Sequence, residues 1–162
     1  MTTQSTDNWI DAPVPLELAV RFAETDLMGV VHHSAYIVWF EAGRVAWMEA
    51  AGMPYTRVAE SGHHFAVTHV EAQYRAAARF GDRVQVITWL ALLRSRRVDF
   101  RYQVRRLGDG TLLATGLSQH ICVDLQGRMS KIPGWVLDGL QAGAARLAQS
   151  GSPAPVFQGD VP

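Results

Sequence analysis

The first clear pattern along the chain is an alternation of apolar and polar residues that predicts a β-strand. Apolar side chains recur at every second position, at Leu16, Leu18, Val20 and Phe22. A period of two residues is typical of a strand that buries one face. The segment before this strand begins with polar residues and ends in two prolines. We therefore expect residues 1–15 to form a flexible N-terminal segment.

The pattern changes to helical spacing after Gly29. One set of apolar and small residues lies at helical intervals, at Tyr36, Phe40, Gly43, Trp47 and Ala50. A second flank is apolar as well, at Ile37, Trp39, Val45 and Met48. A helix that is apolar on most sides is a buried helix. With Ser34 as its N-cap and Gly52 as its stop signal, we expect it to cover about residues 34–51.

The remainder of the chain is predicted to form strands joined by glycine turns, followed by a second helix. We expect strands at residues 65–74, 83–93, 98–107 and 111–123. Their short connections favour an antiparallel sheet. Residues 133–148 have the spacing of a shorter helix, and residues 149–162 are expected to be a tail. The pattern predicts one α+β domain over residues 16–148, either a sheet wrapped around the long helix or a flat sheet backed by two helices.

Composition narrows the classes of protein that fit this pattern. The chain has 162 residues, with 15 basic and 15 acidic side chains. This balance provides no overall attraction for nucleic acid, so we expect no nucleic-acid partner. Cys122 is the only cysteine, so no intrachain disulfide can form. The chain has neither a signal peptide at its N-terminus nor an apolar run long enough to span a membrane, and we expect a cytoplasmic location.

The candidate chemistry lies between the first strand and the long helix. Asp26 stands on the loop that enters the helix, where unpaired backbone amides carry partial positive charge. The amides of Val31, His33 and Ser34 are the expected donors to an oxyanion that develops on a substrate carbonyl. An ionised aspartate can attack that carbonyl or take a proton from the attacking water. A cap of the helix or turn is the structural alternative for Asp26.

The residues around Asp26 also form a recognisable motif. It consists of an Asp-x-x-Gly at Asp26 to Gly29, followed by Val31, His33, Tyr36 and the Phe40-Glu41 pair. This segment resembles the hot-dog fold thioesterases of the 4-hydroxybenzoyl-CoA thioesterase family, and is most similar to the YbgC-like acyl-CoA thioesterases. The resemblance extends over about residues 16–140. It implies a curved antiparallel sheet wrapped around a long central helix, with a short C-terminal helix.

The resemblance also implies an activity. The expected reaction is hydrolysis of an acyl-CoA, or of an acyl-carrier-protein thioester, to a free acid and a thiol. Asp26 would act as nucleophile or general base, with His33 as a second catalytic side chain. Tyr36 and Glu41 are auxiliary candidates, although helical spacing already explains Tyr36 as core. No metal or organic cofactor is expected, because coenzyme A is part of the substrate, and the family implies a homodimer or homotetramer.

Two further groups of residues are candidates for binding coenzyme A. Val67 and Thr68 lie on the strand that the resemblance places beside the pantetheine arm. Arginine makes two-pronged contacts with phosphate, and a cluster of three occurs at a predicted hairpin, at Arg94, Arg96 and Arg97. A second pair, Arg75 and Arg79, lies near another strand end. Exposed arginines are more often a solvated face.

Other functions share parts of this sequence pattern. A noncatalytic acyl-CoA-binding module would keep the pocket but lose the carboxylate at Asp26. A hot-dog hydratase or dehydratase would need a differently placed Asp and His pair, which the sequence lacks. A serine hydrolase is disfavoured because no Gly-x-Ser-x-Gly occurs, and a zinc hydrolase because no His-Glu-x-x-His occurs.

Overall fold

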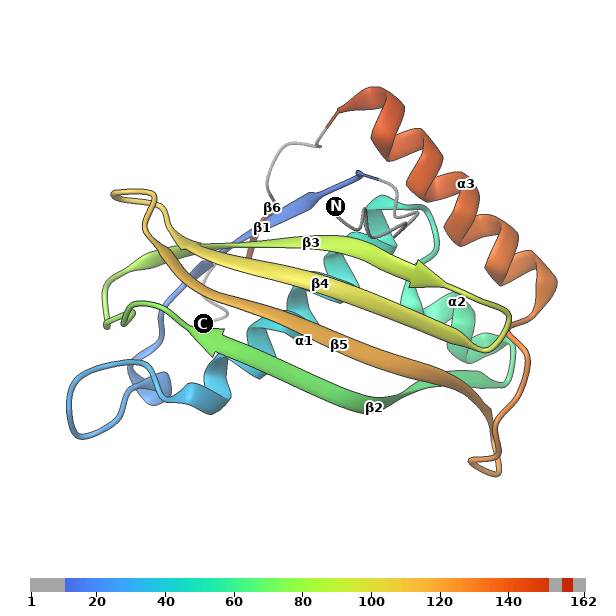
Figure 1. The fold of residues 1–162 in the computed structure, drawn as a ribbon, viewed down its shortest axis with the longest axis horizontal. Coiled ribbons are helices and arrows are strands. Elements are labelled where there is room, and N and C mark those ends of the chain that lie inside the picture. Colours follow the sequence, from blue (N-terminus) through green and yellow to red (C-terminus); the bar gives the residue numbers. More distant parts are fainter. Residues whose placement is uncertain (1–10, 152–155, 159–162) are drawn as a thin grey trace, which may run out of the picture.

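The computed structural model describes residues 11–151 and 156–158, which form one curved sheet around a long helix (Figure 1). The strands are β1 (Val14–Ala19), β2 (His63–Tyr74), β3 (Arg83–Leu93), β4 (Arg97–Arg106), β5 (Leu112–Asp124) and β6 (Val156–Gln158). The helices are α1 (His33–Ala50), α2 (Tyr55–Glu60) and α3 (Gly134–Ser150), with a 3-10 turn at Phe22–Glu24. The strand order is β2-β5-β4-β3-β1-β6, and every pairing is antiparallel except that of β1 with β6.

The sheet wraps α1 because glycine lets the two approach closely. A Cβ added to Gly116 of β5 would lie 2.3 Å from the Phe40 ring, and one added to Gly43 of α1 would lie 2.5 Å from Oγ1 of Thr88. The Phe40 ring stacks on Tyr102 of β4 with 4.5 Å between ring centroids. Of the two arrangements that the periodicity left open, the wrapped sheet is therefore correct, as the family resemblance implied.

The expectation that α1 is buried on most sides is wrong for this chain. The sheet covers one face, where Trp47 is 0% exposed, but Val38 on the opposite face is 55% exposed. Ile37 and Val45 are partly exposed beside it. The shorter helix α3 does not cover this face, because it packs at the C-terminal end of α1, where Gly143 meets the Ala51 carbonyl. One apolar stripe of α1 thus remains open.

The ends of several elements also differ from the predictions. The first strand begins at Val14, inside the segment predicted to be flexible, and Phe22 is 75% exposed in the 3-10 turn that follows rather than buried in the strand. The N-cap of α1 is His32 instead of Ser34. The short strand β6 lies within the predicted tail, and α2 was not predicted. The first ten residues of the predicted N-terminal segment lie outside the described residues.

One edge of the sheet is a long strand. In the described residues β2 pairs only with β5, so the other edge of β2 has no strand beside it. Figure 1 shows this edge next to α1, and Ile37 of the open stripe lines a small cavity together with Val67 and Val70 of β2. None of the described helices is long and apolar enough to cross a membrane.

Candidate active site at the N-terminus of helix α1

A tight loop carries Asp26 to the start of α1. The Asp26 amide donates to the Val30 carbonyl at 2.8 Å, and the Gly29 amide donates to the Asp26 carbonyl at 3.0 Å. Gly29 has a φ of 75°, in the left-handed region that glycine adopts without strain. Oδ1 of Asp26 accepts from the amides of Met28 at 2.8 Å and Val30 at 3.4 Å. The loop is thus closed by its own backbone and by one oxygen of the carboxylate.

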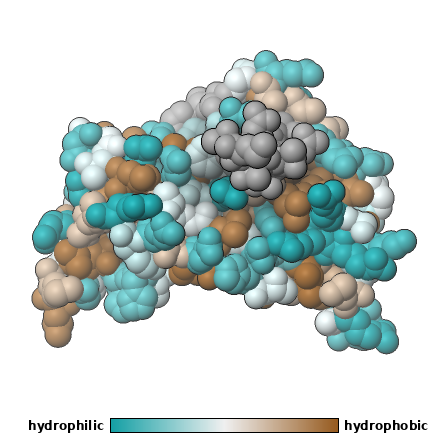
Figure 2. All heavy atoms as spheres, in the orientation of Figure 1, coloured by the Kyte–Doolittle hydropathy of each residue, from teal (hydrophilic) through white to brown (hydrophobic). Residues whose placement is uncertain are grey.

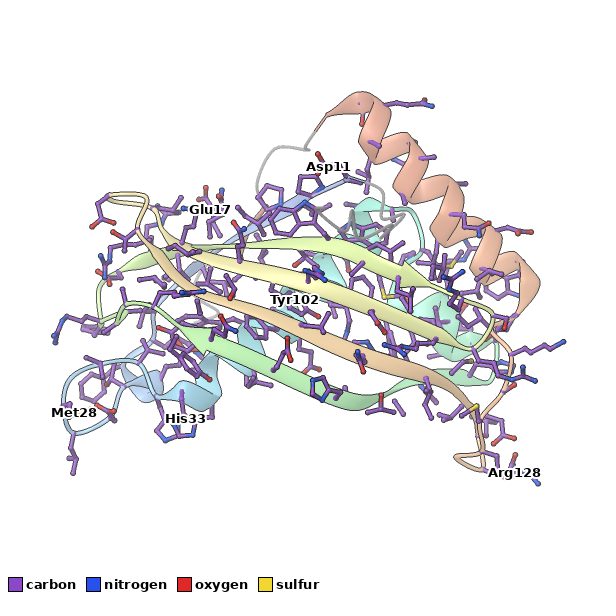
Figure 3. The ribbon with its side chains drawn as sticks, viewed as in Figure 1. Asp11, Glu17, Met28, His33, Tyr102 and Arg128 are labelled. Carbon is purple, nitrogen blue, oxygen red and sulfur yellow. The ribbon has the colours of Figure 1, made fainter. Side chains whose placement is uncertain are left out.

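The second carboxylate oxygen of Asp26 has no hydrogen-bond donor among the described residues, and the side chain is half-buried. Oδ1 of Asp26 therefore caps the turn, which is the structural role expected as the alternative to catalysis. Oδ2 stays available for chemistry. Figure 3 shows Met28 and His33 at this same end of the molecule, and Met28 is 76% exposed. The hydrophobic atoms at the lower left of Figure 2 mark the tip of this loop.

A buried glutamate ties the loop to the helix. Glu24 is 9% exposed, and its Oε1 accepts from Nε1 of Trp39 on α1 at 3.0 Å. Its Oε2 accepts from the Arg21 amide at 2.8 Å, and its carbonyl accepts from the His32 amide at 2.7 Å. Sequence reasoning gave Glu24 no role. The only local signal is the three-residue spacing of Arg21 and Glu24, which says nothing about Trp39.

The amides at the start of α1 differ from the predicted set of oxyanion donors. The Val31 amide donates to the Ala78 carbonyl at 2.8 Å, and the Ser34 amide donates to Nδ1 of His32 at 3.2 Å. Both are therefore already paired, which corrects their assignment as available donors. The His33 amide has no acceptor among the described residues. Of the three predicted donors, only His33 offers an unpaired N–H group.

The side chain of His33 is exposed and does not contact Asp26 in the described hydrogen bonds. Its ring lies against that of His32, with 4.0 Å between centroids. The first turn that carries it is fixed from the sheet, because the Tyr74 hydroxyl donates to the His33 carbonyl at 2.9 Å. The cavity beside Asp26 has a volume of about 410 Å³ and is bordered by His32 rather than by the ring of His33.

The two auxiliary candidates lie away from Asp26. Tyr36 is 2% exposed and packs against Trp39 and Tyr74, so it belongs to the core. Burial raises its pKa, while a backbone hydrogen bond at Ala78 acts in the opposite direction. Glu41 is exposed two turns along α1 and borders a separate, smaller cavity.

The predicted coenzyme A residues divide into two groups. Val67 and Thr68 lie at a β-bulge of β2, where Val67 is 52% exposed and borders the same small cavity as Glu41. Thr68 Oγ1 donates to the Gln119 carbonyl at 3.2 Å. Both residues lie on β2, whose outer edge pairs with no other described strand, so a ligand can approach them from that side.

The three arginines of the β3–β4 turn lie at the opposite end of the sheet from Asp26 (Figure 1). Arg97 is engaged by a two-pronged contact with Asp99, at 2.9 and 2.7 Å, which raises its pKa. Arg94 and Arg96 are exposed. By contrast, Arg79 pairs with Val30 of the Asp26 loop through a β-bridge, and so lies near Asp26 in this chain.

No group of three or more His, Cys, Asp or Glu side chains in the described residues has a geometry that could hold a metal ion. Cys122 is buried in β5, and burial raises the pKa of its thiol, which disfavours the reactive thiolate. The loop and the start of α1 themselves offer a carboxylate oxygen and an unpaired amide.

Comparison with known proteins gives consistent results. A model of the "Thioesterase-like superfamily" matches residues 20–140. The "Putative acyl-CoA thioesterase YneP" of Bacillus subtilis is 34% identical, over 67% of this chain and 78% of that protein. A crystal structure of a hypothetical protein from Thermus thermophilus is 46% identical, with a TM-score of 0.74, over 78% of this chain and 96% of that one. The DHNA-CoA thioesterase of Staphylococcus aureus is 25% identical, with a TM-score of 0.75, over 89% and 98% of the two chains.

Proposed function

Because the chain belongs to the thioesterase-like superfamily, we propose that it is an acyl-CoA thioesterase that hydrolyses its substrate to a free acid and coenzyme A. One observation carries the proposal. The unpaired Oδ2 of Asp26 lies on the loop that opens α1, and the unpaired His33 amide lies at the N-terminus of the same helix. The relative named as an acyl-CoA thioesterase supports the same class of reaction.

The proposed mechanism uses the helix N-terminus to polarise the thioester. The carbonyl oxygen accepts a hydrogen bond from the His33 amide, where the helix dipole adds partial positive charge. Asp26 Oδ2 then either attacks the carbonyl carbon or takes a proton from a water molecule that attacks it. In both routes the carbon–sulfur bond breaks and the coenzyme A thiolate leaves. In the first route the acyl group stays on Asp26 as a mixed anhydride, which water then hydrolyses to the free acid. Loss of one oxyanion donor costs about 10²–10³ in kcat in comparable acyl transfers.

The noncatalytic alternative is less well supported. A module that only binds acyl-CoA has no need for an unpaired carboxylate oxygen on the loop that opens α1, or for an unpaired amide at the N-terminus of that helix. Asp26 and the His33 amide satisfy the need of hydrolysis for a nucleophile or base and for an oxyanion donor. A hydratase or dehydratase finds no support, because His33 and Asp26 are not joined by a described hydrogen bond.

We further propose that two copies associate through the free edge of β2. Antiparallel pairing of two β2 strands about a twofold axis would cover both edges and both open stripes of α1. It would also bring the far end of one subunit, with Arg94 and Arg96, toward the Asp26 end of the other. This is why these arginines remain candidates for the phosphates of coenzyme A. Light scattering that gives a dimer or tetramer mass is expected, and a monomer at micromolar concentration would contradict it.

The direct test is release of free thiol from a panel of short, long and aromatic acyl-CoAs and from an acyl-carrier-protein thioester. Wild type should hydrolyse at least one of them, and Asp26→Asn should be at least about a hundredfold slower, which corresponds to about 2.7 kcal/mol. Asn keeps an oxygen for the Met28 and Val30 amides, so the loop should stay folded. Asp138→Asn, an exposed site on α3, is the matched control. No turnover of any thioester would favour the binding module.

A further inference from the structure

A second, smaller cavity lies between α1 and the sheet. Its volume is about 60 Å³. Apolar side chains of α1 and β2 form one part of its wall, and four polar residues form the rest, namely Glu41, Arg44, Tyr102 and Ser118. Tyr102 and Ser118 are buried, and their hydroxyl oxygens lie 2.6 Å apart. Figure 3 shows Tyr102 in the middle of the sheet, away from the end that carries Met28 and His33.

Arg44 brings a charge into this cavity that no described carboxylate neutralises. Its guanidinium donates to Nε2 of His120, which is 0% exposed. Nδ1 of His120 lies 3.1 Å from the Val98 carbonyl and donates to it, so Nε2 is left as the acceptor. Burial and the charge of Arg44 lower the pKa of His120 to about 4, so this partner is neutral at physiological pH. None of the ion pairs among the described residues includes Arg44.

Glu41 borders the same cavity without neutralising Arg44. The two residues are one turn apart on α1, a spacing at which side chains of opposite charge can form an ion pair. No hydrogen bond or ion pair joins them in the described residues, and the Glu41 side chain is exposed. The cavity wall therefore presents a strong donor, Arg44, and a strong acceptor, Glu41, that do not bind each other.

The cavity lies along the path from the His33 amide. His33, Ile37, Glu41 and Arg44 follow one stripe of α1, because they are spaced by four, four and three residues. β2 runs beside this stripe in the opposite direction, since Tyr74 contacts His33 and Val67 borders the cavity. At 1.5 Å per residue, the cavity begins roughly 6 Å from His33 along the helix. An acyl group whose carbonyl is held at the His33 amide would extend toward it.

We propose that this cavity is a specificity subsite for the distal end of the acyl group, and that it selects a hydroxyl, either an alcohol or a phenol. The hydroxyl oxygen accepts from Arg44, and its proton is donated to Glu41. A hydroxyl accepts and donates through a single oxygen atom, which suits a cavity as small as this one. The volume corresponds to about two water-sized groups, enough for a hydroxyl and its carbon. A carboxylate end is disfavoured because Glu41 would repel it. The inference rests on the proposed thioesterase function.

The test compares matched pairs of substrates that differ only in the distal hydroxyl. Suitable pairs are 4-hydroxybenzoyl-CoA with benzoyl-CoA, and ω-hydroxyacyl-CoAs of medium length with the unsubstituted acyl-CoAs. For at least one pair, kcat/KM should be about tenfold to a hundredfold higher for the hydroxylated member, as expected for hydrogen bonds to charged groups. Equal values in every pair would overturn the subsite and leave the thioesterase function standing. A lack of turnover for every thioester would overturn both.

Substitutions at the cavity assign the preference to its residues. Glu41→Ala should bring the ratio of the two kcat/KM values to within about threefold of one, and Arg44→Met should do the same if it folds. Because Glu41 is exposed, Glu41→Ala keeps the test valid even if Arg44→Met is unstable. The matched control is Glu49→Ala on the same helix, which should keep the wild-type ratio. An unchanged ratio in Glu41→Ala, or a preference for ω-carboxyacyl-CoAs in wild type, would contradict the proposal.

Discussion

The two halves of α1 are held in different ways. At its N-terminus the Asp26 loop is fixed by short backbone hydrogen bonds, while Met28 is 76% exposed. In its second half Trp47 is 0% exposed and packs edge to face on Phe100. The first half leaves polar groups unpaired and accessible, as the proposed reaction requires. Unpaired polar groups lower the stability of the fold, and the packing of the second half offsets this loss. Changes in the two halves should therefore affect different measurements.

The largest expected effect is on the packed half. Trp47→Ala removes a fully buried ring and its hydrogen bond to the Ala12 carbonyl at 2.9 Å. We expect a loss of about 3–5 kcal/mol in the free energy of unfolding, measured by urea denaturation. At temperatures where the variant is folded, its kcat should stay within about threefold of wild type. A large fall in kcat with normal stability would contradict the conclusion that the second half of α1 contributes stability and the first half carries the reactive groups.

The next effect is a dependence of stability on pH through His120. In the unfolded chain this histidine is protonated below its usual pKa of 6.5, whereas in the folded protein it stays neutral down to about pH 4. The unfolded state thus binds more protons in this window, so stability falls as the pH falls from 6.5 to 4. The loss from this group is about 3 kcal/mol. Urea denaturation at several pH values should show it, and His120→Gln should abolish that part of the slope.

A smaller effect is expected at Glu24, which ties the Asp26 loop to Trp39 in the first half of α1. Glu24→Gln keeps an oxygen for Trp39 but loses an acceptor at the Arg21 amide. We expect kcat to fall about tenfold and stability to fall by about 1–2 kcal/mol, because the partly buried Arg21 amide is left without its acceptor. Kinetics and thermal unfolding on the same samples measure both, with Glu49→Gln as control. A variant that matches this control in kcat would show that Glu24 does not position the loop.

The smallest effect concerns Thr88 of β3, which packs against the second half of α1. Its Oγ1 is buried without a hydrogen-bond partner among the described residues and lies against Gly43 of α1. Thr88→Val replaces this hydroxyl with a methyl group of similar shape. We expect the free energy of unfolding to rise by about 1 kcal/mol, with unchanged kcat. A decrease in stability would mean that the hydroxyl is paired in the folded protein.

Local patterns predicted most of the elements. The third strand, expected at residues 83–93, coincides with β3, and the long helix differs by one residue at each end. The exceptions have local causes too. Phe22 follows the period of the strand, but the chain turns away before it, and its ring meets Phe80 instead of the core. His32 takes the N-cap from Ser34 because its ring nitrogen accepts the Ser34 amide.

The candidate site was only partly predictable. The motif located Asp26 and the His33 amide, because both follow from one short segment between a strand and a helix. It could not show that the Val31 amide is paired, since its acceptor, Ala78, lies on a distant loop. Nor could it show that Arg94 lies at the opposite end of the sheet from Asp26, because that depends on the direction of β3.

The sequence by itself determined most of the elements, the fold class, the family and the candidate loop at Asp26, because these depend on periods of two and 3.6 residues and on a contiguous motif. Only the tertiary structure decided which polar groups are paired. Glu24 meets Trp39 across 15 residues, and Arg44 meets His120 across 76. Such partners are set by the register of the sheet and by how closely α1 approaches it, which no local pattern encodes. Among the described residues, Asp26 Oδ2 and the His33 amide have no hydrogen-bond partner and the charge of Arg44 has no carboxylate beside it, and we propose that these groups bind the substrate.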